Sequence, residues 1–329
     1  VMSIVCLLIY KEPPRDTESE SRRSLKEVFR GMVEVVGNLR FFILVSGILV
    51  VLVMGSKWWS FTLVGWVAAA WLVGNLLLDV LFRAAGSGDA QRPWFLQPMK
   101  IGEGRYLLFL LLMAGVWVSF NQRFMTLPEY IRDYVDTSDL IATFGPVAGW
   151  FTGIAQGMGF DTSNWSRAVL EHGQVKPEHL INLNAFGIIC FQVLISYLMR
   201  NTTPLVSIIA GVCVTIASFG LYLVGMTGWI VVSAILVFSL GEMMASPRSK
   251  EYAGRIAPPE KVGMYMGYFY WCVALGHLFG GLLSGLSYQY FGPKGIDNPD
   301  VMWIIFAALA GTTAVSLVVY NRWVTPGSR

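Results

Sequence analysis

Charged residues are scarce in this 329-residue sequence. Only 14% of the residues are Asp, Glu, Lys or Arg, against about 25% in an average soluble domain. So small a charged fraction argues against a single soluble enzyme domain. The 24 basic and 21 acidic residues leave a net charge of +3, without the basic excess typical of nucleic-acid-binding proteins. In contrast, 55% of the residues are hydrophobic, including 12 Trp, 13 Tyr and 20 Phe. This composition excludes intrinsic disorder and indicates a multi-pass membrane protein.

Signatures of catalysis and metal binding are missing as well. The sequence contains no GxxxxGK[ST] phosphate loop, no HExxH, no GxSxG and no cluster of Cys and His. Its four cysteines lie in apolar stretches, without metal spacing, and we interpret them as packing residues; they are Cys6, Cys190, Cys213 and Cys272. We therefore expect neither enzyme activity nor a bound cofactor.

Eight stretches are predicted to cross a bilayer, for which about 20 largely apolar residues are needed. They are 41–56, 58–78, 106–122, 180–199, two spans within 202–241, 262–293 and 301–321. The 40 residues of 202–241 contain no charge, and they divide at the turn 225–228. The fold class is therefore all-α, a polytopic helical membrane protein.

The distribution of Lys and Arg predicts which loops are cytoplasmic, because short cytoplasmic loops carry the basic excess. Segment 11–40 contains seven basic residues, and alternation then puts the basic loop 248–261 and the C-terminus on the same side. Segment 140–160 is also uncharged, but a crossing there would move 248–261 outside. We therefore predict an external loop at 137–179 with a partly buried or re-entrant piece. Its glycines, spaced by four, could instead mark a close helix–helix contact.

The first ten residues are apolar but too short to span, since ten helical residues reach about 15 Å. They also lack the basic start and the cleavage site of a signal peptide. We interpret 1–10 as the tail of a membrane helix whose beginning is missing; the alternative is a natural short N-terminus with Met2 as initiator. The remaining organisation is a linker with an amphipathic cytoplasmic helix, a transmembrane hairpin, a second linker, a six-helix bundle and a cytoplasmic tail. Their bounds are 11–40, 41–82, 83–105, 106–322 and 323–329.

Polar residues inside the predicted spans are candidates for function, because an ionisable side chain in hydrocarbon needs a cavity or a partner. Glu242 follows the long uncharged stretch and could take up and release a proton, or it could pair with a base of 248–261. Three amide side chains could face a solute path or act as hydrogen-bonding contacts between helices. They are Asn184 and the two consecutive residues Asn121 and Gln122. His277 is either a proton relay or a packing histidine.

Several short motifs resemble the C-terminal half of a major facilitator superfamily (MFS) transporter, and in detail its proton-dependent oligopeptide transporter (POT) family. Residues 117–122 (WVSFNQ) are similar to its seventh helix, where FW is followed by an acidic residue and Gln. Residues 181–184 (INLN) resemble its eighth-helix QxLNP opening. The most specific match is 241–247 (GEMMASP), which resembles the tenth-helix GELxxSP stretch. Residues 266–276 resemble the eleventh helix.

The resemblance implies that 1–10 ends the sixth helix, that 11–40 is the central cytoplasmic loop, and that 41–82 is the pair of helices which bacterial members insert. It also implies a set of candidate residues for the solute and the coupling proton. They are Glu242, Asn121, Gln122, Asn184, Trp117 and His277. The sequence departs from the family pattern at Asn121, where the family has an acid, and no Pro follows Asn184.

We therefore expect the C-terminal portion of a secondary active transporter that works by alternating access. The coupling ion would be a proton, and the substrate a small polar organic solute, peptide-like by resemblance. The other expected partners are the lipid bilayer and the N-terminal half of the same transporter, in a bacterial or archaeal plasma membrane.

Two rival hypotheses keep the membrane location. One is a transport-inactive receptor or assembly protein with the same fold, which Asn121 favours. The other is a lipid-modifying enzyme with Glu242 and His277 as acid and base, which requires the two side chains within hydrogen-bond reach, directly or through one water.

Overall fold

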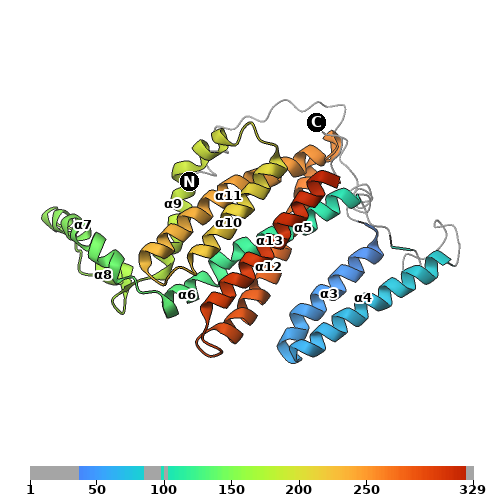
Figure 1. The fold of residues 1–329 in the computed structure, drawn as a ribbon, viewed down its shortest axis with the longest axis horizontal. Coiled ribbons are helices and arrows are strands. Elements are labelled where there is room, and N and C mark those ends of the chain that lie inside the picture. Colours follow the sequence, from blue (N-terminus) through green and yellow to red (C-terminus); the bar gives the residue numbers. More distant parts are fainter. Residues whose placement is uncertain (1–36, 85–97, 100–102, 324–329) are drawn as a thin grey trace. The chain divides into compact units, whose positions relative to one another are not determined.

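The computed structural model describes residues 37–84, 98–99 and 103–323 (Figure 1). The chain divides into two units, 1–104 and 105–329, and each is treated by itself. The expected helix tail 1–10, most of the linker 11–40 with its amphipathic helix, most of the linker 83–105 and the tail beyond residue 323 lie outside the described residues.

The described part of the first unit is a helical hairpin, as expected for 41–82. Helix α3 (Leu39–Trp58) begins at Asn38, whose side chain accepts a hydrogen bond from the Phe41 amide. Helix α4 (Phe61–Ala84) returns alongside it, and the Trp71 indole of α4 donates to the carbonyl of Leu44 at 3.1 Å. Trp71 can approach α3 closely because residue 47 is a glycine, whose added Cβ would lie 2.5 Å from the indole ring.

Among the described residues of the second unit, six helices are long and apolar enough to cross a membrane, which confirms the predicted six-helix bundle. Short helix α6 directly continues the first of them. The elements are α5 (Gly104–Met125), α6 (Leu127–Tyr134), α9 (Pro177–Leu198), α10 (Pro204–Leu221), α11 (Gly228–Ile256), α12 (Val262–Phe291) and α13 (Pro299–Trp323).

Among the described residues, seven helices are long and apolar enough to cross a membrane. The eighth predicted span corresponds to α3, whose apolar stretch Leu39–Gly55 is shorter. The chain is thus an integral multi-pass membrane protein.

The core of the bundle is formed where α10 packs against α11 and α13. Helices α10 and α11 approach closely at two glycines: a Cβ on Gly211 would lie 2.5 Å from the Gly241 carbonyl oxygen, and one on Gly241 would lie 2.6 Å from the Gly211 oxygen. An aromatic cluster fills one end of the bundle, where the Trp303 ring stacks on Tyr222 with ring centroids 4.1 Å apart. Close backbone approach at small residues is the usual packing mode of membrane helices.

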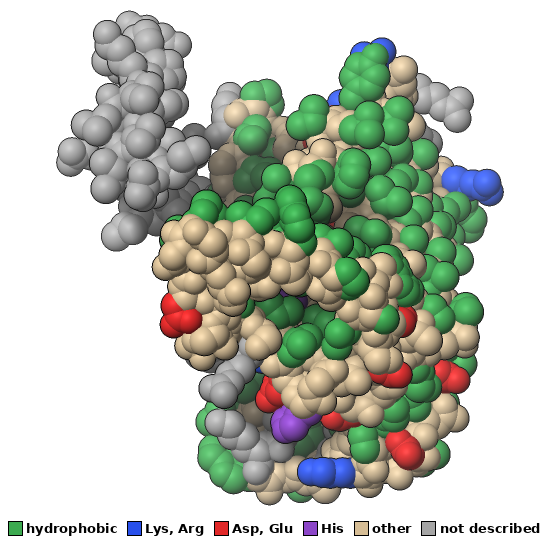
Figure 2. Space-filling view, turned by 90° about the vertical axis from the view of Figure 1, so that its left-hand side faces the viewer, with side chains coloured by type: hydrophobic (Ala, Val, Ile, Leu, Met, Phe, Trp, Pro, Cys, Tyr) green, Lys and Arg blue, Asp and Glu red, His purple; other side chains and the backbone are tan. Residues whose placement is uncertain are grey.

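The outer surface of the bundle is largely apolar. On α9, for example, Ile189 and Val193 are each 81% exposed. Figure 2 shows hydrophobic side chains spread over the face it draws, with the Asp and Glu side chains confined to its lower half. Soluble proteins rarely expose contiguous apolar patches of this kind, whereas lipid or another membrane segment covers them favourably.

Between α6 and α9 the chain forms an excursion that contains helix α7 (Ser138–Gly157), helix α8 (Trp165–Val169) and two short strands. Strands β1 (Leu170–Glu171) and β2 (Gln174–Val175) pair antiparallel. The predicted external loop 137–179 therefore contains a 20-residue helix, which runs through Pro146. Of the residues of α7, only Leu140 and Ala155 are buried within the chain.

Candidate functional site

Glu242 is the centre of a polar cluster formed by three helices. Its Oε2 atom accepts a hydrogen bond from Nη1 of Arg123 at 2.8 Å and another from Nδ2 of Asn184 at 3.0 Å. The three residues come from α11, α5 and α9, and their side chains are almost buried, with Glu242 16% exposed and Arg123 6% exposed. The structure thus brings together two of the residues predicted from sequence, Glu242 and Asn184, with a third that was not predicted.

Arg123 is the residue that the sequence analysis missed. Its guanidinium carbon lies 4.0 Å from the centroid of the Phe124 ring and 5.1 Å from that of Phe238, so the cation is held between aromatic faces as well as by Glu242. Its Nε atom is buried and has no hydrogen-bond partner among the described residues. Removing one partner of a buried ion pair costs about 3–5 kcal/mol, because the other charge is left desolvated and uncompensated. Arg123 and Glu242 therefore depend on each other.

Asn184 connects the ion pair to the packing of α9 against α11. Its amide nitrogen also lies 3.0 Å from the hydroxyl oxygen of Ser239, which in turn donates to the carbonyl of Ile235. Gly187, one turn along α9, also faces Ser239, and a Cβ added there would make an ordinary contact of 3.7 Å with the Ser239 Cβ. Asn184 therefore makes the hydrogen-bonding contact between helices that was one of its two alternatives, and it also donates to Glu242.

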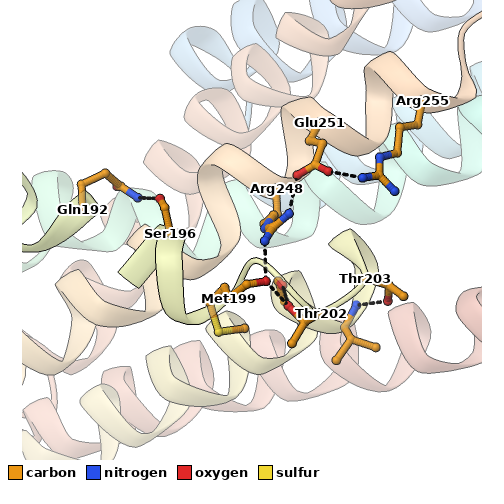
Figure 3. Close-up of polar contacts among 10 residues, drawn as sticks. Gln192, Ser196, Met199, Thr202, Thr203, Arg248, Glu251 and Arg255 are labelled. Carbon is orange, nitrogen blue, oxygen red and sulfur yellow. Dashed lines mark hydrogen bonds and ion pairs between the residues drawn. The ribbon is translucent and has the colours of Figure 1, made fainter. Parts of the chain in front are cut away.

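The basic residues of 248–261 do not pair with Glu242 in the described contacts. Figure 3 shows that Arg248 points instead toward the turn between α9 and α10, where it donates to the carbonyl of Met199. Its Nη1 atom bonds Glu251 at 2.7 Å, and Arg255 bonds the same carboxylate at 2.6 Å (Figure 3). Among the described residues, Arg123 is therefore the basic residue that pairs with Glu242.

A second polar cluster lies between α5 and α12. Nδ2 of Asn121 is 3.1 Å from Nδ1 of His277, which is also 2.9 Å from the carbonyl of Val273. Gln122 is fully buried and donates to the carbonyls of Val118 and Gly280. Asn121 and Gln122 thus face α12, whereas Arg123, the next residue, faces α11.

Trp117 belongs to the packing of the same two helices. A Cβ on Gly276 would lie only 2.3 Å from the Cβ of Trp117, so α12 approaches α5 here because residue 276 is a glycine. The indole nitrogen of Trp117 is buried, with no partner among the described residues. No hydrogen bond within the described residues joins His277 to Glu242, so the acid–base pair required by the enzyme hypothesis belongs to two separate clusters.

An open groove of about 1170 Å³ lies beside the second cluster, between α6 and α12. Its lining includes Glu129, Arg132, Asp133, Tyr288 and Lys294. Arg132 bonds both acids of this lining, and Tyr288 donates to Asp133.

One lining residue links the groove to the buried amides. The hydroxyl oxygen of Ser284 lies 2.8 Å from that of Thr126, which donates to Gln122 at 2.7 Å. A chain of polar groups thus leads from the groove to Gln122 and its neighbour Asn121.

The fold of the chain is that of known transporters. It matches the crystal structure of a POT family transporter in complex with 5-aminolevulinic acid with a TM-score of 0.51 and 17% identity, over 92% of this chain and 56% of that one. It matches the POT family transporter PepTSo with a TM-score of 0.54 and 17% identity, over 97% of this chain and 61% of that one. The fold of this chain is similar to about three fifths of a POT family transporter.

A curated relative points the same way. An uncharacterised MFS-type transporter of Bacillus subtilis (strain 168), YttB, is 22% identical over 165 residues, which are 48% of this chain and 39% of the relative. No protein-family model matches the sequence. The chain therefore spans about three fifths or less of the length of the transporters that it resembles, and it carries the MFS-type resemblance predicted from its motifs.

Proposed function

We propose that the chain is the C-terminal portion of a secondary active transporter that couples the uptake of a small polar organic solute to a proton. The observation that supports this best is the Arg123–Glu242–Asn184 cluster: one ion pair, in the middle of membrane-spanning helices, with ligands from three of them. Charges at such a depth are costly and are usually kept for a transport or relay function.

The ion pair suggests how a proton and a solute could be coupled. Protonation of Glu242 removes the counter-charge of Arg123, and a buried guanidinium without a counter-charge is unfavourable. A solute that carries a carboxylate can then compensate Arg123, so that proton and solute each favour the binding of the other. Reciprocal coupling between two binding events is the thermodynamic requirement of symport.

The fold neighbours and this charge pattern support the proposed substrate class. One POT family structure contains 5-aminolevulinic acid, a small molecule with an amine and a carboxylate. A peptide-like or amino-acid-like solute would place its carboxylate near Arg123, which protonated Glu242 leaves without a counter-charge. In this proposal Asn121 and His277 form a further polar part of the same solute path, and the protein acts without a cofactor.

The proposal is tested with the full-length transporter in liposomes, by uptake of labelled 5-aminolevulinic acid or a dipeptide under an imposed proton gradient. Glu242→Gln should abolish gradient-driven uptake and leave solute exchange across the membrane measurable, because the neutral side chain still fits the site. The matched control is Glu251→Gln, which removes an acid from the same helix outside the cluster and should leave coupling intact. Gradient-independent uptake by the unmodified protein, or coupled uptake by Glu242→Gln, would refute the assignment.

The receptor hypothesis makes a different prediction for the same liposomes. A protein that has kept the fold without transport would bind solute but would not accumulate it at any proton gradient. Asn121, in place of the family's acid, favours this outcome. Accumulation above equilibrium in the unmodified protein excludes it.

A further inference from the structure

Helix α7 is an apolar helix with almost no partner inside the chain. The sequence contains no charge over 140–160, and large apolar side chains of α7 are well exposed, with Trp150 63% and Phe151 56% exposed. Figure 1 shows α7 and α8 at a distance from most of the bundle helices. Leaving apolar side chains in water costs about 25 cal/mol per Å² of exposed surface, relative to burying them in an apolar environment.

The two sides of α7 carry side chains of different size. The bulky side chains recur every three or four residues, which places them on one side of a helix; they are Phe144, Val147, Phe151 and Ile154, with Met158 following at the C-cap. The opposite side carries a glycine at every fourth position, and a Cβ added at any of these would meet nothing within 4 Å; they are Gly145, Gly149, Gly153 and Gly157. One side of α7 is thus suited to an apolar medium, and the other presents little beyond backbone.

The excursion that contains α7 leaves and re-enters the bundle at one point. The amide and the hydroxyl of Thr137 each lie 2.6 Å from Oε1 of Gln174, and the amide of Val175 donates to the Thr137 hydroxyl at 2.8 Å. The same point is tied to the start of α11, because the Asp136 amide donates to the carbonyl of Met226 at 3.0 Å. Residues 138–173 therefore begin and end at the membrane boundary from which α11 starts.

This closure argues against a crossing by α7. A helix of 20 residues is about 30 Å long, so a crossing would carry the return segment 158–173 through the membrane as well. That segment contains four ionisable residues, namely Asp161, Arg167, Glu171 and His172. Each would cost several kcal/mol in hydrocarbon.

We infer that α7 lies in the membrane interface, with its bulky face buried among the lipids of the leaflet at the α11 start and its glycine face toward water. The occupant of the bulky face is the bilayer itself, because α7 is fastened at the boundary of helices that already expose apolar side chains to it. Trp side chains are enriched at membrane–water interfaces, and α7 carries the exposed Trp150. The interface position depends only on the membrane-spanning fold and not on the proposed transport.

The test uses spin labels in the full-length protein, reconstituted into vesicles of phosphatidylethanolamine and phosphatidylglycerol, with the native cysteines replaced by serine. Labels at Phe151→Cys and Ile154→Cys should be more accessible to oxygen, which concentrates in lipid, than to a water-soluble nickel chelate. Labels at Gly145→Cys and Gly149→Cys, on the opposite side, should show the reverse preference. The two glycine positions are matched controls because an added Cβ is unobstructed there.

Three outcomes would overturn the inference. Preference for the nickel chelate at all four positions means that α7 is in water, and preference for oxygen at all four means that it enters the bilayer completely. Protection of the bulky face from both reagents means that a second copy or another protein covers it. If the serine variants do not fold, a photoreactive benzoylphenylalanine at position 151, in the protein with its native cysteines, should form a phospholipid adduct. The same residue at position 149 should not, and adducts only with protein would again overturn the inference.

Discussion

The Arg123–Glu242 pair can be tested through stability as well as transport. Glu242→Gln keeps the shape of the side chain and its contact with Asn184, but it leaves the guanidinium of Arg123, only 6% exposed, without a counter-charge. Breaking a buried pair from one side costs about 3–5 kcal/mol. Because Glu242 is 16% exposed, we expect the lower end of this range, about 3 kcal/mol.

The double variant Arg123→Gln/Glu242→Gln distinguishes a buried pair from two independent polar residues. It removes both charges together with the desolvation cost of each, and replacing a whole buried pair is often close to neutral. We therefore expect the double variant to be more stable than Glu242→Gln alone, although coupled uptake stays absent in both. Recovery of stability without recovery of coupled uptake in the double variant would separate the structural role of the pair from its functional role.

The assay is thermal unfolding of the full-length protein in detergent, followed by tryptophan fluorescence. Glu251→Gln is again the control, because Glu251 is 32% exposed and partly solvated ion pairs contribute at most about 1 kcal/mol. If the double variant is less stable than Glu242→Gln, the two charges do not compensate each other and the proposed coupling through Arg123 fails.

Three other predictions concern packing and the loop. Gly276→Val should destabilise the bundle by about 1–3 kcal/mol, because its Cβ would fall 2.3 Å from that of Trp117; a lowered unfolding midpoint checks this. Gly211→Ala, which meets the Gly241 carbonyl, should have a similar effect, whereas alanine at the glycines of α7 should change the midpoint little. The Asp136 carboxylate accepts hydrogen bonds from the amide and the hydroxyl of Ser138 and from the side chain of Gln174. These bonds hold the pKa of Asp136 below its usual range. The ionised carboxylate therefore fastens the loop fully above about pH 4 and releases it as the pH falls through the lowered value. Limited proteolysis of 137–174 should accelerate on acidification, and Asp136→Asn should remove this pH dependence.

The spans and Glu242 could be predicted because both depend on local sequence. A helix in lipid needs a continuous apolar stretch, and a carboxylate after forty uncharged residues stands out in any window. The contact between Asn184 and Glu242 could not be found in this way, since the two residues are 58 positions apart and meet only through the packing of α9 on α11.

Helix α7 was not the preferred prediction for its segment, because the local sequence is misleading there. Its four evenly spaced glycines and Pro146 are typical of loops, because glycine and proline each weaken an isolated helix. The helix nevertheless extends from Ser138 to Gly157. The spacing of its glycines was compatible with a helix, but not as a mark of a close helix–helix contact, since a Cβ added at any of the four meets nothing within 4 Å.

Arg123 was hidden by the rule that ended a span at its first charge. The predicted span stopped at residue 122, whereas the helix continues to Met125 and, through α6, to Tyr134. Tyr134 and Gly228, the first residue of α11, lie at the same end of the bundle, since the Gly228 amide donates to the carbonyl of Asp136 at 2.9 Å.

Counting from that common end places the two charges at similar depth. Arg123 is 134 − 123 = 11 residues from it and Glu242 is 242 − 228 = 14 residues from it, which at about 1.5 Å per residue gives depths of about 17 and 21 Å. A buried charge in a membrane helix needs a cavity or a partner, and an opposite charge at comparable depth on a neighbouring helix is one such partner, as with Arg40 of α3 and Asp79 of α4, 4.0 Å apart in the hairpin. Matching depths of unlike charge, measured from helix ends that are tied together, would therefore have identified Arg123 as the partner of Glu242.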